Sequence, residues 1–74
     1  MTPAIVPMAP GEQPTEPGWY VLESEVERCR EVVEVSKMTF ETELVMQPVG
    51  TEDWWPISRE KGNFIARIVL ERIG

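Results

Sequence analysis

The sequence predicts an all-β protein with one small antiparallel sheet of about five strands, curled into an SH3-like or OB-like open barrel or meander. Short runs of aromatic and β-branched residues are separated by turn residues, which is typical of strands joined by tight connections. Residues 38–46 alternate between apolar and acidic side chains, which is typical of an antiparallel strand with one wet face. We place this β domain at residues 19–74, after a Pro-rich arm at residues 1–18.

The alternation in residues 38–46 is the basis of the strand prediction. Every second position but one is apolar, and these positions are Met38, Phe40, Leu44 and Met46. The positions between them are Thr39, Glu41, Glu43 and Val45. Because side chains of a strand point alternately to its two faces, we expect Phe40 in the core and Glu41 and Glu43 on a solvated face.

The arm and the first strand are separated by a turn signal. The arm contains Pro3, Pro7, Pro10, Pro14 and Pro17. Five prolines in 18 residues exclude a helix or an interior strand, so the arm is predicted to be extended or disordered. The pair Pro17-Gly18 indicates a turn, and the aromatic and β-branched run that follows, residues 19–22, is predicted to be the first strand.

Two later segments admit both a strand and a helix. The valines of residues 29–37 favour a strand that feeds a tight turn, whereas Ser24 and Glu27 form a capping-box pattern for a helix over residues 24–34. The β-branched content of residues 64–73 favours a strand, although a helix capped by Asn63 is the alternative. Between them, residues 47–53 read as a loop, and residues 54–58 as a short strand that Pro56 confines to an edge.

Composition narrows the classes of function. The net charge is −6, and residues 22–53 hold nine acids against three bases. Such a surface disfavours direct binding of nucleic acid or an anionic membrane and favours a basic protein partner. No apolar run approaches the roughly 20 residues that span a bilayer, and we expect a cytoplasmic protein. A core this small supplies little stability, which makes a homodimer a reasonable expectation.

The sequence offers little for catalysis, so we predict a protein that is not an enzyme and has no cofactor, metal site or catalytic residue. There is no histidine, which removes the commonest general base and metal ligand. Cys29 lies between two arginines, but a lone cysteine is more often structural than reactive. Glu41 and Glu43 have the spacing of a glycosidase pair, about 7 Å along a strand, yet alternating glutamates are common on wet strands.

The predicted partner-binding residues combine aromatic and acidic side chains. Adjacent strand residues point to opposite faces, so one of Trp54 and Trp55 can enter the core while the other binds a partner or is covered by the arm or a loop. Together with the acids on the wet strand and in the following loop, the predicted site consists of Trp54, Trp55, Glu41, Glu43, Glu52 and Asp53.

Two aromatic motifs carry a resemblance to known proteins. Gly18-Trp19-Tyr20, followed about 35 residues later by Trp54-Trp55-Pro56, resembles a set of short phage and prophage accessory proteins. The resemblance covers residues 18–73 and implies a small SH3-like β fold, although the acidic stretch at residues 23–35 departs from the pattern. It implies an accessory protein that binds and blocks a host enzyme or defence complex.

Three further hypotheses remain open at the level of sequence. If Glu41 and Glu43 are joined by Glu23 or Glu31 on adjacent strands, the carboxylates repeat at about the density of DNA phosphates, and the protein is a nucleic-acid mimic. Alternatively, it is a small homo-oligomeric assembly component of a phage. A third alternative is a small β-barrel that binds a ligand at its mouth, near Trp54 or Trp55.

Overall fold

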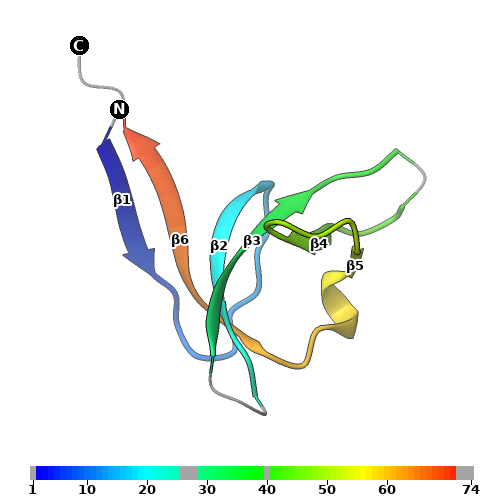
Figure 1. Ribbon diagram of the computed structural model, residues 1–74, viewed down its shortest axis with the longest axis horizontal. Coiled ribbons are helices and arrows are strands. Elements are labelled where there is room, and N and C mark those ends of the chain that lie inside the picture. Colours follow the sequence, from blue (N-terminus) through cyan, green and yellow to red (C-terminus); the bar gives the residue numbers. More distant parts are fainter. Residues whose placement is uncertain (1, 26–28, 40, 72–74) are drawn as a thin grey trace.

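The computed structural model describes residues 2–25, 29–39 and 41–71, and these form one antiparallel sheet (Figure 1). Its elements are β1 (Thr2–Pro7), β2 (Gly18–Glu23), β3 (Arg30–Ser36), β4 (Val45–Pro48), β5 (Trp55–Pro56), a short 3-10 helix η1 (Ile57–Arg59) and β6 (Asn63–Glu71). The strand order is β1-β6-β2-β3-β4-β5. Strands β2 to β5 make a meander, and β6 returns to pair with β2, so the all-β prediction of a small, open, curled sheet is confirmed.

The core lies on one face of the curled sheet. Tyr20 and Leu22 of β2 point into it together with Val33 and Val35 of β3, as the period of 2 requires. The rest of the buried cluster is Met46, Ile57 and Phe64. The rings of Tyr20 and Phe64 meet edge to face, with centroids 6.1 Å apart, which is a favoured aromatic geometry.

The predicted strand at residues 38–46 is wrong over most of its length, because β4 begins only at Val45. The backbone before it turns: the Glu41 N–H donates to the Met38 carbonyl, and the Lys37 ammonium donates to the Glu41 carbonyl. Val45 was expected on the wet face, yet it is buried, as is its neighbour Met46. Local hydrogen bonds therefore outweigh the period-2 pattern here. Phe40 lies outside the described residues, so its burial stays a prediction.

The two ambiguous segments are strands. β3 covers Arg30–Ser36 and β6 covers Asn63–Glu71, which confirms the strand interpretation against the helical one in the described parts of both segments. The predicted edge strand at residues 54–58 is shorter than expected, because the chain passes into η1 after Pro56. No helix among the described residues is long and apolar enough to cross a membrane.

The first part of the Pro-rich arm is a sixth strand, which the prediction of about five strands did not include. β1 pairs antiparallel with β6 and lies at the edge of the sheet. The Met8 N–H donates to the Ile65 carbonyl, so even-numbered residues of this segment turn their N–H groups toward β6. Pro3 and Pro7 are odd-numbered, so their backbone nitrogens point away from β6. The N–H that proline lacks therefore costs no hydrogen bond of the sheet.

Candidate functional site

Two rows of residues on the face of the sheet opposite the core are largely apolar, although this face was expected to be wet and acidic. Residues that lie directly opposite each other on paired strands share a face. One such row across five strands is Ile5, Ile68, Trp19, Glu34 and Gln47. The next row is Pro7, Ala66, Val21, Val32 and Val49. Glu34 is the one charged residue in these two rows, but the row beyond Val21 and Val32 contains the Glu23–Arg30 ion pair, so this face has mixed charges at one end and lacks the predicted ladder of acids. We call these two rows the outer face.

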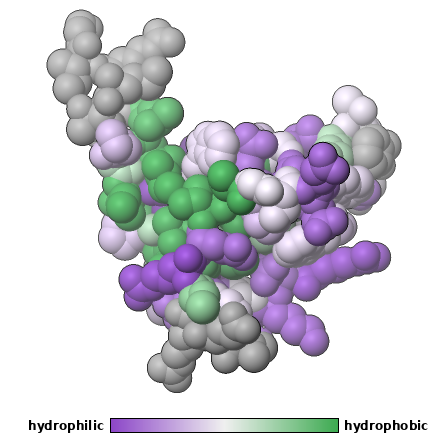
Figure 2. All heavy atoms as spheres, in the orientation of Figure 1, coloured by the Kyte–Doolittle hydropathy of each residue, from purple (hydrophilic) through white to green (hydrophobic). Residues whose placement is uncertain are grey.

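Several side chains of the outer face are open to solvent. The exposed fractions are 68% for Ile5, 58% for Val49, 40% for Trp19 and 39% for Val32. Figure 2 shows apolar residues gathered over β1, β6 and β2. Single exposed apolar residues are ordinary, but a contiguous exposed apolar area marks a surface that binds something.

A hollow of about 190 Å³ lies beside Trp19 on this face. Its lining comes from β2, β3, β4 and the loop after β4, and consists of Trp19, Glu34, Gln47, Pro48, Val49, Gly50 and Thr51. The loop is held by its own hydrogen bonds. The Gln47 side-chain amide donates to the Thr51 carbonyl over 2.7 Å, and the Thr51 hydroxyl donates to the Pro48 carbonyl over 3.0 Å. The hollow is therefore preformed.

A glycine fixes the turn of this loop. Gly50 has a φ of +89°, in the left-handed region where other residues are strained. The Thr51 N–H donates to the Pro48 carbonyl over 3.2 Å, which closes the turn around Val49 and Gly50. This conformation leaves the Val49 side chain 58% exposed at the rim of the hollow.

The two tryptophans differ in exposure, and of the two Trp55 alone lies in a strand, β5. Trp55 is half-buried against the core, and its indole N–H donates to a Glu60 carboxylate oxygen over 2.9 Å. Trp54 is 38% exposed. Neither of them lines the hollow beside Trp19 or the second hollow described below.

The predicted acids lie at opposite ends of β4. Glu41 and Glu43 precede the strand and are half-buried, and the Ser58 hydroxyl donates to Glu43 over 2.6 Å. Glu52 and Asp53 are exposed in the loop that follows the strand. The length of β4, about 10 Å, separates the two points where these segments leave it. The strand that would have displayed Glu41 and Glu43 as a regular ladder is absent, which removes the geometric basis of the mimic hypothesis.

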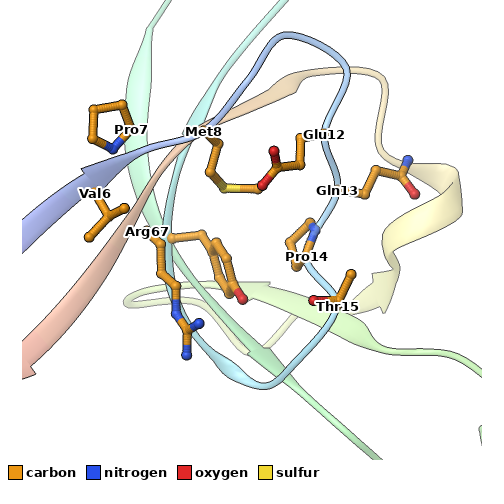
Figure 3. A pocket seen from close by; sticks show the side chains of 9 residues that line it. Val6, Pro7, Met8, Glu12, Gln13, Pro14, Thr15 and Arg67 are labelled. Atoms are coloured by element: carbon orange, nitrogen blue, oxygen red, sulfur yellow. The ribbon is translucent and has the colours of Figure 1, made fainter.

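A second hollow, of about 200 Å³, lies under the arm (Figure 3). Figure 3 shows Met8, Glu12 and Pro14 of the arm on one side and Arg67 of β6 on the other. Tyr20 also lines it; its hydroxyl donates to the Glu16 carbonyl over 2.8 Å.

Charge and ring contacts join the arm to the sheet beside this hollow. Arg67 forms an ion pair with Glu16 and lies 5.9 Å from the centroid of the Tyr20 ring. Burial raises the pKa of the Tyr20 phenol above its ordinary value, although the nearby Arg67 charge opposes this. These contacts hold the arm against β2 and β6.

Three residues of the outer face were not predicted from the sequence as site residues: Trp19, Val32 and Val49. The available signal was the run Trp19-Tyr20-Val21-Leu22, in which both parities are apolar. A strand with two apolar faces needs cover on both sides. The core covers Tyr20 and Leu22, whereas Trp19 stays 40% exposed.

The described residues show no group of three or more acids and cysteines placed to hold a metal ion. Cys29 is exposed directly before β3. No protein-family model, no curated protein and no solved structure matches this chain.

Proposed function

We propose that the protein is a non-catalytic interaction protein that docks on another protein through the outer face, with Trp19 as its anchor. One observation supports this most directly: an exposed tryptophan of the outer face borders a preformed hollow that is lined by both apolar and polar residues. Tryptophan is enriched among residues that dominate binding energy, and such residues insert beside pockets that exclude water.

The surroundings of the hollow favour a partner with an apolar knob and a basic rim. The hollow accepts an aliphatic or aromatic side chain against Trp19, Pro48 and Val49. Glu34 lies in its lining, and Glu52 and Asp53 are exposed in the same loop. The overall charge of −6 would steer a basic surface toward this side of the molecule.

The resemblance to phage and prophage accessory proteins supports a host protein as the partner. Trp19 belongs to the Gly18-Trp19-Tyr20 motif on which that resemblance rests. Docking of a rigid face on a host enzyme or defence complex would block it without any chemistry in the docked protein, which agrees with the composition of this chain.

Site-specific photo-crosslinking tests the proposal even while the partner is unidentified. A photo-reactive phenylalanine analogue at position 49 should crosslink one host protein in lysate. Excess unmodified protein should compete this crosslink away, whereas a Trp19→Ala variant, shown to be folded by its thermal melt, should compete poorly. The matched control places the same analogue at position 61, where an exposed lysine lies in a polar turn.

Two outcomes would contradict the proposal. Equal crosslinking from positions 49 and 61 would show that the hollow has no preference for a partner. Competition by Trp19→Ala that equals competition by the wild-type protein would remove Trp19 as the anchor.

A further inference from the structure

The outermost part of the sheet is a two-stranded ribbon that projects from the rest of the protein. β2 pairs with β6 only as far as Ile68, and beyond this residue β6 has β1 as its one strand partner in the described sheet. Figure 1 shows β1 and the end of β6 side by side and leading away from the other strands. We call β1 together with residues 68–71 the terminal ribbon.

The terminal ribbon is apolar and poorly covered. Directly opposite pairs put Pro3, Ile5, Ile68 and Leu70 on one face of it. Of these, Ile5 is 68% exposed and Leu70 is 53% exposed. On the other face, Val6 is 48% exposed. A two-stranded ribbon alone is marginally stable in water, so this exposure calls for a covering surface.

The molecule as a whole exposes more surface than a compact monomer of its mass. The accessible surface is 5506 Å² for a mass of 8.5 kDa, whereas a compact monomer of this mass exposes about 4,700 Å². The radius of gyration is 12.5 Å for 74 residues, and about 11 Å is expected of a compact chain. The surplus for the whole molecule, about 800 Å², is comparable to the area that one partner contributes to an ordinary interface, and the exposed side chains of the terminal ribbon account for part of it.

The edges of the sheet disfavour association by strand addition. On the free edge of β1, Pro3 and Pro7 occupy outward-facing positions, so Ile5 offers the one N–H between them. The opposite edge, β5, has two residues and includes Pro56. Prolines and short strands are common devices against edge-to-edge pairing. The terminal ribbon is therefore left with its apolar faces for contact.

Charge distinguishes a second copy from a basic partner at this place. Residues 2–7 and 68–70 contain no charged side chain, although the chain as a whole has a charge of −6. Two acidic chains can meet here without opposing like charges at the centre of the contact. A basic partner would find one acid in the terminal ribbon, Glu71 at the last position of β6.

We propose that two copies of the chain form a two-fold dimer in which the Pro3, Ile5, Ile68 and Leu70 faces of their terminal ribbons pack against each other. The contact is isologous, since each copy presents the same patch, and it closes at two copies. This interface shares Ile5 and Ile68 with the outer face but includes none of the residues that line the hollow beside Trp19, so the proposal goes beyond the docking function and does not depend on it.

Sedimentation equilibrium from micromolar to millimolar concentration tests the dimer. The wild-type protein should reach twice the mass of the 8.5 kDa chain. Ile5→Lys should raise the dissociation constant about tenfold or more, because it places an unpaired charge in an apolar contact. Val49→Lys is the matched control: it makes the same charge change at another exposed residue and should leave the dimer intact.

Further readouts keep the test decisive if Ile5→Lys disturbs β1. Leu70→Lys makes the same change on β6, which is also held by β2, and should weaken the dimer similarly. Higher salt should tighten the dimer, since it screens repulsion between two acidic chains. A wild-type protein that stays monomeric or forms larger assemblies would overturn the proposal. Equal weakening by Val49→Lys, or a dimer that salt dissociates, would do the same.

Discussion

Two residues of one strand, Phe64 and Leu70, show how differently the two halves of this sheet are built. Phe64 is 5% exposed, while Leu70, further along β6, is 53% exposed. Both lie on a strand paired on at least one side by backbone hydrogen bonds. Near Phe64 the sheet curls over itself and η1 supplies Ile57 to the same cluster, whereas near Leu70 the sheet is a two-stranded ribbon.

The difference teaches that pairing and burial are separate contributions. Backbone pairing satisfies N–H and C=O groups, but apolar side chains leave water only where a second layer lies over them. The body of the protein, which consists of β2 to β5, η1 and residues 63–66, has such a layer. The terminal ribbon lacks one within a single chain.

Alanine substitutions at Phe64 and Leu70 should differ more in their effect on the free energy of unfolding than any other pair of variants considered below. Phe64→Ala should lower the free energy of unfolding by about 3–5 kcal/mol, because it removes a buried ring and leaves a cavity. That loss is close to the whole stability expected of a domain this small. Leu70→Ala should cost less than about 0.5 kcal/mol in the monomer. Urea denaturation at low protein concentration measures both, and similar losses would contradict the contrast between body and terminal ribbon.

The body was largely predictable from the sequence and the terminal ribbon was not. β2 follows from a dense run of aromatic and β-branched residues, and the β-branched content of β3 and β6 favoured a strand over the helical alternative. The prolines of residues 1–18 correctly exclude helix, but they do not exclude an edge strand. Whether β1 pairs depends on β6, more than 50 residues away, and the pattern of residues 1–18 does not contain this information.

The outer face could not be assigned from one strand at a time. Residues 38–46 alternate cleanly, yet local hydrogen bonds at Lys37 and Glu41 turn the chain before the strand begins. The true outer face is assembled from five strands, and its register depends on a β-bulge between Val21 and Leu22. A shift of the strand register by one residue exchanges the two faces of the sheet. The sequence pattern alone therefore does not decide whether Trp19 lies on the core face or on the outer face.

Gly62 offers the next largest effect and tests how tightly the body is packed. A Cβ added at this position would lie 2.7 Å from the Glu23 carbonyl oxygen of β2, a backbone atom that cannot move freely. Gly62→Ala should therefore cost about 1–3 kcal/mol, as overpacking does elsewhere. Lys61→Ala, at the exposed neighbouring position, should stay within about 0.5 kcal/mol. If thermal melts of the two variants coincide, the body is looser at this turn than the structure indicates.

Tyr20 lies where the body meets the arm, and its hydroxyl should contribute a smaller amount. Tyr20→Phe removes the hydrogen bond to the Glu16 carbonyl and should cost about 0.5–1.5 kcal/mol near neutral pH. The pKa of Tyr20 is raised in the folded protein, mainly by burial. The unfolded chain therefore loses this proton first as the pH rises above about 10, and the stability falls there.

The pH profile separates this contribution from general packing. The wild-type protein should lose stability between about pH 10 and the higher folded-state pKa, whereas Tyr20→Phe should lose less over the same interval. Denaturant titrations from pH 8 to the alkaline limit compare the two slopes. Parallel profiles would show that Tyr20 does not have a raised pKa in the folded state.

The ion pair between Glu16 and Arg67 should give the smallest effect, and it reports how firmly the arm joins the terminal ribbon to the body. The side chains are 56% and 34% exposed, so water and salt screen the pair. Glu16→Gln keeps the shape of the side chain and the backbone carbonyl that accepts from Tyr20, and it should cost about 0.2–1 kcal/mol at low salt. Glu12→Gln removes another exposed acid of the same arm and serves as the control for net charge.

Hydrogen exchange shows where this small loss occurs. If the pair holds the arm, the Met8 amide, which donates to the Ile65 carbonyl, should exchange faster in Glu16→Gln than in Glu12→Gln. Amides of β2 and β3 should be unaffected, because every fully buried member of the core cluster lies outside the arm, although Met8 packs against it. The difference at Met8 should shrink as salt is added. Equal exchange at Met8 in both variants, or a loss that spreads into β3, would mean that the arm and the body open as one unit.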